Sequence, residues 1–246
     1  MGTSTRSAPA RSVRGSPSPT REPPLGRTLF LLNLKVYPAV LGKGARALGE
    51  MLQRVAAERA IPAAIAPPMP DLSTLAGALS IPVLAQHVDP FDAGARTGWV
   101  PAEAVRAVGA RGSLVNHSEH PLEPGLVRVA VDRLRAEGLV AVVCARTTGE
   151  AVDLARTRPE YLAIEPPELI GGPVSVSSAR PELIRETVDA VRKVSPTTLV
   201  LCGAGIRDRR DVAKSIELGS AGVLVASAVT TAPDPERALR ELLDGF

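Results

Sequence analysis

Short apolar runs alternate with longer amphipathic stretches along the chain from residue 28 onward. Runs rich in β-branched residues, Leu and Ala predict strands at residues 29–34, 63–66, 83–86, 113–116, 140–144, 162–165, 198–202 and 222–226. Apolar residues at three- and four-residue spacing then predict helices at residues 45–59, 71–79, 102–108, 126–137, 149–156, 181–194, 208–218 and 235–243. Asp71, Thr148 and Pro181 stand where N-caps or first-turn prolines are expected.

The predicted strands are apolar throughout rather than alternately polar and apolar. Such strands are buried on both faces, which is typical of a parallel sheet covered by helices. Eight strand–helix units follow one another between residues 28 and 246, so the sequence predicts an α/β fold with one (β/α)8 barrel as the single domain. A doubly wound open sheet is the alternative architecture. Aromatic residues make up only 2% of the chain, so aliphatic side chains must fill the core.

Residues 1–27 are of a different kind, dense in Ser, Pro, Thr and Arg and without periodicity. Such a segment buries too little apolar surface to offset its ordering entropy, so we expect a disordered tail. It holds five arginines against one glutamate, so the net charge of +3 becomes −1 once the tail is set aside. A targeting presequence is the alternative explanation of this composition, which the missing amphipathic pattern disfavours.

The near-neutral body of the chain argues against a nucleic-acid partner, which would require a basic surface. No apolar run approaches the roughly 20 residues of a membrane span, and no secretory segment is recognisable, so we expect a cytoplasmic protein without a membrane partner. Cys144 and Cys202 have no metal-ligating neighbours at short spacing. We therefore expect buried, reduced thiols and no metal site.

Polar residues that are rare in this chain stand at the ends of predicted strands. Asn33 and Lys35 end the first strand, His117 ends the fourth and Glu165 ends the sixth. Small residues follow the last two strands, at Gly203, Gly205, Ala226 and Ser227. Each alone has an ordinary structural explanation, such as a solvated loop lysine, a capped histidine or a tight turn. Because the carboxyl ends of barrel strands form one rim that carries the active site, their convergence favours a catalytic site.

Seven segments extend this pattern in order, namely Asn33-Leu34-Lys35 and residues 85–90, 94–98, 116–119, 165–171, 202–206 and 225–227. Together they resemble the motifs of triosephosphate isomerases, most closely the compact archaeal-type branch, and the resemblance covers about residues 29–243. It implies a TIM barrel that interconverts dihydroxyacetone phosphate and D-glyceraldehyde 3-phosphate through an enediol or enediolate. It implies no metal or organic cofactor.

The resemblance also implies roles for single residues. Glu165 would be the base that moves a proton between neighbouring carbons. His117 would polarise the carbonyl as a neutral imidazole held neutral by the following helix, an arrangement for which this family is itself the standard example. Lys35 would supply fixed positive charge against the enediolate and the phosphate, and Asn33 a hydrogen-bond donor. Glu119 would be a supporting carboxylate near Lys35.

Substrate-binding residues follow from the same resemblance. Ile170 and Gly171 would lie in a lid over the substrate, and backbone amides near Gly171, Gly205, Ala226 and Ser227 would hold its phosphate. The family usually carries Gly-Thr-Gly where this chain has Gly171-Gly172-Pro173. Since Pro173 lacks an N–H, lid closure is expected to differ. A longer phosphosugar such as a tetrulose phosphate is therefore an alternative substrate, and a non-catalytic barrel that binds phosphometabolites is an alternative function that would need no base.

Residues 94–98, with the sequence Gly-Ala-Arg-Thr-Gly, resemble the family's interdigitating loop 3. In the family the tip of this loop reaches the neighbouring subunit. We therefore expect self-association through Gly94 to Gly98, as a homodimer or a homotetramer.

Overall fold

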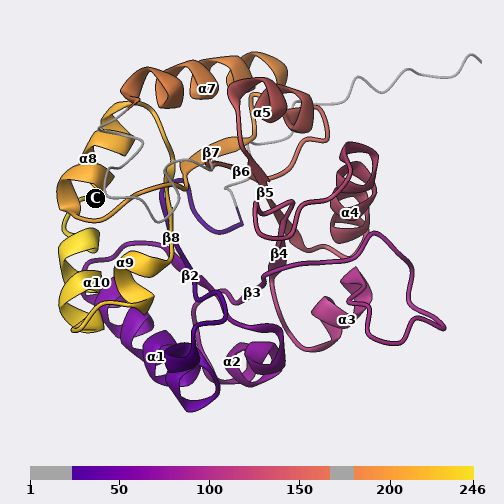
Figure 1. The fold of residues 1–246 in the computed structure, drawn as a ribbon, viewed down its shortest axis with the longest axis horizontal. Helices are drawn as coiled ribbons and strands as arrows, with labels where there is room; N and C mark the ends of the chain where they lie inside the picture. Colours follow the sequence, from indigo (N-terminus) through magenta and orange to yellow (C-terminus); the bar gives the residue numbers. More distant parts are fainter. Residues whose placement is uncertain (1–23, 167–179) are drawn as a thin grey trace, which may run out of the picture.

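The computed structural model describes residues 24–166 and 180–246, whose strands form a parallel barrel ringed by helices (Figure 1). The strands are β1 Leu29–Asn33, β2 Ala63–Ala66, β3 Leu84–Ala85, β4 Gly112–Val115, β5 Val140–Ala145, β6 Tyr161–Ile164, β7 Leu199–Cys202 and β8 Gly222–Val225. Their order is β2-β1-β8-β7-β6-β5-β4-β3, and a parallel bridge between Ile65 and Val83 joins the two ends. The predicted (β/α)8 barrel is confirmed, and the open doubly wound sheet is wrong.

Helices follow the strands in the predicted alternation. They are α1 Lys43–Glu58, α2 Leu72–Ala78, α3 Ala102–Ala107, α4 Pro124–Ala136, α5 Thr148–Ala155, α7 Pro181–Val194, α8 Arg209–Glu217, α9 Ser227–Thr230 and α10 Pro235–Leu243, with 3-10 turns at Pro38–Val40 and Met69–Asp71. The sequence pattern did not predict α9, because four residues are too few to show a helical period. Pro181 begins α7 as expected.

The predicted cap Thr148 is wrong, and Asp71 stands at the expected N-cap position without a capping bond. Thr147 rather than Thr148 caps α5, with its hydroxyl accepting a hydrogen bond from the Glu150 N–H, while Thr148 lies inside the helix. Asp71 precedes α2 without capping it, and its carboxylate instead accepts from the Gly42 N–H at 2.9 Å. The bond between Asp71 and Gly42 is a tertiary contact across 29 residues, which a local pattern does not contain. The Thr147 cap is local, and the predicted cap misses it by one residue.

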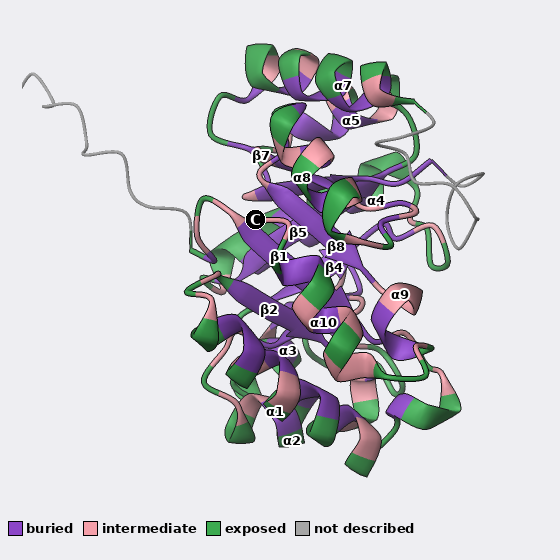
Figure 2. Ribbon diagram, turned by 90° about the vertical axis from the view of Figure 1, so that its left-hand side faces the viewer, coloured by how far each residue is buried: buried purple, intermediate pink, exposed green. Residues whose placement is uncertain are grey.

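Alternate residues along each strand face opposite sides, so the barrel wall separates two apolar clusters. The strands themselves are almost entirely buried (Figure 2). Leu29 and Leu31 of β1 belong to the inner cluster, whereas Phe30 and Leu32 belong to the outer cluster beneath the helices. Continuing this alternation brings Asn33 back to the inner side at the end of the strand. The same period turns polar residues at other strand ends toward the barrel mouth.

The opposite end of the barrel is closed by residues just ahead of β1. Leu25 is buried in the inner cluster, and its N–H donates to the hydroxyl of Tyr161, which in turn donates to the Gly26 carbonyl at 2.8 Å. These contacts belong to the barrel floor, although the expected barrel domain begins at residue 28. The division into a tail at 1–27 and a barrel at 28–246 stays a prediction, since residues 1–23 lie outside the described part.

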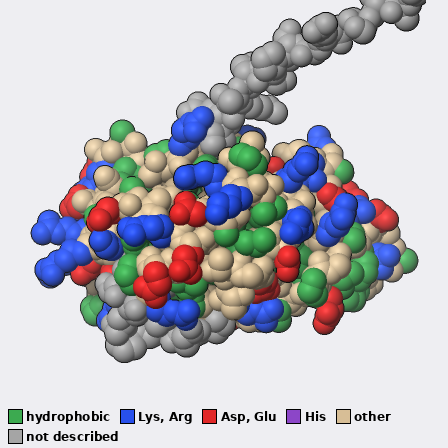
Figure 3. Space-filling view, turned by 90° about the horizontal axis from the view of Figure 1, so that it is seen from above, with side chains coloured by type: hydrophobic (Ala, Val, Ile, Leu, Met, Phe, Trp, Pro, Cys, Tyr) green, Lys and Arg blue, Asp and Glu red, His purple; other side chains and the backbone are tan. Residues whose placement is uncertain are grey.

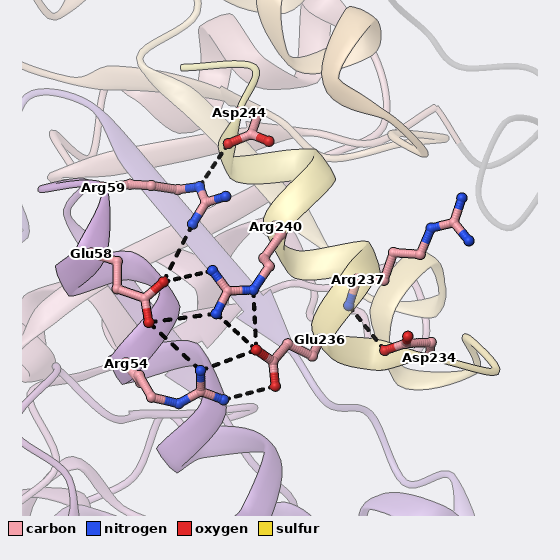
Figure 4. A network of polar contacts seen from close by, with 8 residues as sticks. All are labelled: Arg54, Glu58, Arg59, Asp234, Glu236, Arg237, Arg240 and Asp244. Carbon is pink, nitrogen blue, oxygen red and sulfur yellow. Dashed lines mark hydrogen bonds and ion pairs between the residues drawn. The ribbon is translucent and has the colours of Figure 1, made fainter.

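A network of ion pairs joins α1 to α10, the first and last large helices of the barrel (Figure 4). Arg54 makes two hydrogen bonds to the carboxylate of Glu236, at 2.8 and 3.0 Å. Arg240 bridges Glu58 at 2.6 Å and Glu236 at 2.8 Å. Arg59 and Asp244 form a further pair at 2.7 Å, included in the same figure. The network therefore links the two ends of the described barrel at their surface.

Both signs of charge occur on the face of the molecule that Figure 3 shows. The face in Figure 3 mixes Lys and Arg with Asp and Glu rather than gathering one charge. Among residues 24–166 and 180–246, no helix is both long and apolar enough to cross a membrane.

Cys144 and Cys202 are both buried and free, which confirms the prediction of buried thiols.

Candidate active site

The carboxyl ends of the strands surround a cavity of about 580 Å³. Its wall includes seven of the predicted site residues, which come from five different strand ends, namely Asn33, Lys35, His117, Glu165, Gly205, Ala226 and Ser227. Glu119 lines a neighbouring cavity, and its carboxylate forms an ion pair with Lys35. Ile170, Gly171 and Pro173 lie outside the described residues. The structure thus brings together, around one opening, side chains that are far apart in the sequence.

The link that follows β1 is held by Gln86. Its Nε2 donates to Asn33 Oδ1 at 3.2 Å and to the Lys35 carbonyl at 3.0 Å. Asn33 Oδ1 also accepts from the Lys35 N–H at 3.0 Å, so the Asn33 amide oxygen is occupied and Nδ2 is the donor that remains for the cavity. Lys35 itself has φ 52°, a left-handed conformation that is rare for residues other than glycine and clusters at functional sites.

Gln86 has a place in this site that sequence reasoning did not assign to it. It was noticed only as part of the segment 85–90. The available signal is its position, a polar residue at the end of the otherwise apolar run that contains β3.

Lys35 is oriented by an ion pair. Its Nζ lies 2.5 Å from Glu119 Oε1, and its side chain is only 12% exposed whereas that of Glu119 is 57% exposed. The ammonium therefore sits at the inner end of a pair whose carboxylate faces solvent. This arrangement holds a cation in a fixed place at the edge of the cavity.

Asn116 turns the chain so that His117 reaches the cavity. It is also left-handed, at φ 61°, and its Nδ2 donates to the Cys144 carbonyl at 3.0 Å. Its Oδ1 accepts from the Leu122 N–H, so both ends of the amide are used in anchoring the loop. Asn116 was recognised within its motif without a role. These bonds identify it as an anchor for the segment that carries the imidazole.

A backbone N–H indicates the tautomer of His117. The N–H of Glu119 donates to His117 Nδ1 at 3.2 Å, which requires an unprotonated Nδ1. The proton of the neutral ring, assigned from this bond, is then on Nε2, the nitrogen nearer Glu165. Helix α4 begins only at Pro124, so the N–H that meets Nδ1 comes from the turn at 117–120. The influence of the helix on His117 stays a prediction.

Glu165 is a buried carboxylate at the centre of the site. It is 3% exposed, its Oε1 lies 3.7 Å from His117 Nε2, and its Oε2 has no hydrogen-bond partner among the described residues. Burial raises the pKa of Glu165 above its ordinary value, while His117 and a hydrogen bond from the Cys144 thiol act in the opposite direction. A desolvated carboxylate with a free oxygen is suited to accept a proton.

Gly203 leaves room for this carboxylate. A Cβ at Gly203 would lie 2.5 Å from Glu165 Cγ and 3.1 Å from its Oε1. Cys144 of β5 belongs to the inner cluster. Burial, and then the negative charge of Glu165, raise the pKa of the Cys144 thiol well above its ordinary value. The thiol is therefore expected to stay protonated beside the carboxylate.

The remaining wall is built from backbone at the ends of β7 and β8. Gly205 has φ 69°, and Ala226 and Ser227 begin the short helix α9. N–H groups in the first turn of a helix have no intrahelical acceptor, so this part of the cavity offers neutral donors to an anion. The cavity thus combines a buried carboxylate, an imidazole, an ammonium group and backbone N–H groups.

A family model described as triosephosphate isomerase matches residues 28–242 of this chain. The chain belongs to the triosephosphate isomerase family. The relative from Methanothermus fervidus is 41% identical over 219 residues, which cover 89% of this chain and 99% of the relative. Relatives from Caldivirga maquilingensis and Cenarchaeum symbiosum are 43% and 44% identical over 214 residues, covering 87% of this chain and 95% and 96% of their own lengths. All three are named triosephosphate isomerase, and the predicted archaeal-type resemblance is confirmed.

Proposed function

We propose that this chain interconverts dihydroxyacetone phosphate and D-glyceraldehyde 3-phosphate by proton transfer through an enediolate. The observation that carries the proposal is the pairing of a buried carboxylate, Glu165, with the neutral imidazole of His117 at 3.7 Å. A protein that only binds phosphometabolites needs no buried base. Nearly full-length relatives named triosephosphate isomerase support the same reaction.

In this mechanism Glu165 takes a proton from the carbon beside the carbonyl and returns it to the neighbouring carbon. The His117 Nε2–H donates a hydrogen bond to the oxygens that exchange the carbonyl, and Asn33 Nδ2 donates a second one. Lys35 stabilises the negative charge that develops on the enediolate. Only protons move between carbon and oxygen atoms, so the reaction as written needs neither a metal nor an organic cofactor.

The substrate's phosphate would lie against the backbone amides of Gly205, Ala226 and Ser227. Ile170 and Gly171, outside the described residues, would cover it, because an enediolate phosphate exposed to water can lose its phosphate. The isomerisation is a step of glycolysis and gluconeogenesis. We place it in the cytoplasm as part of the same proposal.

The test is a coupled assay of the full chain with each triose phosphate and with a four-carbon ketose phosphate. We expect turnover of both triose phosphates and little or none of the longer sugar. Preference for the four-carbon substrate would favour the alternative isomerase that Pro173 first suggested. Absence of turnover with all three substrates, together with tight binding of phosphoglycolate, would favour the non-catalytic barrel.

We further propose self-association through loop 3. Residues 94–98 are exposed, and the loop is braced from within by the edge-to-face contact of Phe91 with Trp99 and by Arg96 over the Phe91 ring. Beside it lies a second cavity of about 660 Å³, lined by Val36, Met69 and Trp99 among others. Val36 and Trp99 are 69% and 51% exposed.

This second cavity shares Asn33, Lys35 and His117 with the catalytic cavity. An exposed loop tip and an exposed, partly apolar cavity on the same chain suit two copies that exchange loops across a symmetric interface. The tip of one copy would then pack close to the catalytic residues of the other, as a homodimer or within a homotetramer.

A further inference from the structure

The side chain of Asn116 closes the turn that carries His117. Its Oδ1 accepts from the Leu122 N–H at 3.0 Å, so the amide spans the turn from one end to the other. Within this turn the Glu119 N–H donates to His117 Nδ1 at 3.2 Å. The imidazole is therefore held by a piece of backbone whose shape depends on the Asn116 amide.

Two neighbouring elements hold the other end of the same amide. Asn116 Nδ2 donates to the carbonyl of Cys144 at 3.0 Å and to Oε1 of Glu150 at 3.2 Å. Cys144 belongs to β5, which pairs with β4, and Glu150 lies in the first turn of α5. Asn116 is 4% exposed. A buried amide that is bonded through both its oxygen and its nitrogen is fixed in orientation by its partners.

Glu150 is itself held in place by Arg146. The Arg146 N–H donates to Oε2 at 2.8 Å, and its guanidinium donates to Oε2 and Oε1 at 3.0 and 2.9 Å. Burial acts to raise the pKa of Glu150, but the hydrogen bonds from Arg146 and Asn116 outweigh it and lower that pKa below its ordinary value. The carboxylate is therefore ionised at neutral pH and presents a fixed acceptor to Asn116.

This chain of hydrogen bonds connects Glu150 to the catalytic site from outside. Glu150 is part of neither the wall of the catalytic cavity nor that of the second cavity, whereas its partner Asn116 directly precedes His117. We propose that Glu150 is a positioning residue for His117, whose imidazole it holds in place through the Asn116 amide. The inference rests on the proposed isomerase function. Misplacing a reacting group by about 1 Å can cost around a hundredfold in rate, so such support matters for turnover.

The test compares Glu150→Ala with a matched control, Glu160→Ala. Glu160 also accepts from a backbone N–H of β5, that of Ala141 at 2.9 Å, but it borders the cavity at the opposite end of the barrel. Circular dichroism first verifies the fold of each variant. We expect kcat for D-glyceraldehyde 3-phosphate to fall about tenfold in Glu150→Ala, the scale of one lost hydrogen bond, with KM near that of the parent. Glu160→Ala should keep the kcat of the parent, and Glu150→Gln, which retains one acceptor oxygen, should fall between the two.

A double-mutant cycle tests whether Glu150 acts through Asn116. Asn116 has φ 61°, which glycine adopts without strain, so Asn116→Gly removes the amide while the backbone conformation stays accessible. We expect Asn116→Gly to lower kcat at least as far as Glu150→Ala does. The double variant Asn116→Gly/Glu150→Ala should then lose little more than Asn116→Gly alone, because the contact between Glu150 and the turn is already gone.

The imidazole itself gives a readout that needs no turnover. The chain has three histidines, so few imidazole nitrogen signals overlap in an NMR spectrum. In the parent we expect a single neutral tautomer of His117 with an unprotonated Nδ1, as its bond from the Glu119 N–H indicates. In Glu150→Ala the Nδ1 and Nε2 signals should move toward each other as the two tautomers mix, whereas Glu160→Ala should match the parent.

Equal kcat in Glu150→Ala and Glu160→Ala would overturn the proposal, and so would losses in kcat that multiply in the double variant. If Asn116→Gly does not fold, the His117 signals of Glu150→Ala decide the question, and unchanged signals would contradict positioning. Failure of the isomerase function looks different, because the parent would then turn over neither triose phosphate. In that event the same His117 signals still decide whether Glu150 fixes the imidazole.

Discussion

Glu165 combines a buried position with a hydrogen bond from a neighbouring thiol. The carboxyl ends of the strands could be predicted, and their positions placed Asn33 and Glu165 on one rim from the sequence alone. The hydrogen bonds that hold the site residues in place could not be predicted, because they join segments that are far apart in the sequence. Gln86 reaches Asn33 across 53 residues, and the Asn116 amide reaches the Cys144 carbonyl across 28. No local pattern contains such partners, so the sequence points to the reacting groups more readily than to the residues that hold them.

The Cys144 thiol makes a prediction at this scale. Its hydrogen bond lowers the pKa of Glu165, so Cys144→Ala should raise that pKa further and move the acid limb of the kcat/KM profile to higher pH. Cys202→Ala is the matched control, because Cys202 is equally buried but belongs to the outer cluster. Both variants should lose about 1 kcal/mol of stability. Superimposable pH profiles for the two variants would show that the thiol does not tune the base.

Among the helices and strands, the hydrophobic period and the length of each element determined whether it could be predicted. All eight strands and the longer helices were found from their apolar spacing, with boundaries displaced by a residue or two. The short helix α9 was missed, although it carries Ser227 into the cavity. The ion pairs between α1 and α10 were also beyond prediction, since Arg54 and Glu236 are 182 residues apart. They meet only because the barrel closes.

This network predicts a pH-dependent contribution to stability. Hydrogen bonds from Arg54 and Arg240 lower the pKa of Glu236 from 4.5 to about 2. A depressed folded-state pKa gives stability that is present above pH 4.5 and is lost as the pH falls toward 2. The Tm of Glu236→Gln should therefore lie below that of the parent at pH 6 and approach it near pH 2.

Because these side chains are exposed, added salt should also narrow the Tm difference. Glu217→Gln is the control, since Glu217 pairs only with Lys214 of its own helix among the described residues. A Tm difference for Glu236→Gln that is constant from pH 6 to pH 2 would contradict a role for the ionised network.

At the scale of the whole molecule, barrel closure brings loop 3 and the catalytic rim to one face. The loop's role in self-association was an expectation from resemblance, and one chain cannot display its partner. What the described residues add is a receiving surface, since the second cavity combines Val36 and Trp99 with Lys35. Assembly and activity are therefore expected to depend on each other.

Thr97→Glu tests this dependence by placing a charge at the exposed loop tip. If the tip enters the partner's cavity, burying the carboxylate there is unfavourable, so the variant should dissociate to monomers at concentrations where the parent is associated. Thr197→Glu adds the same charge beside the cavity at the opposite end of the barrel and should leave assembly unchanged. Sedimentation equilibrium measures both. An unaltered assembly in Thr97→Glu would remove loop 3 from the interface.

The central claim is that Glu165 transfers the proton, and the turnover of Glu165→Asp tests it most directly. The shorter side chain withdraws the carboxylate by about 1 Å, which can cost around a hundredfold in rate. Phosphoglycolate should still bind, since its phosphate meets other groups. We predict that kcat for isomerisation of D-glyceraldehyde 3-phosphate falls about a hundredfold while phosphoglycolate affinity stays near that of the parent. An unchanged kcat in a correctly folded Glu165→Asp protein would contradict the assignment of Glu165 as the base.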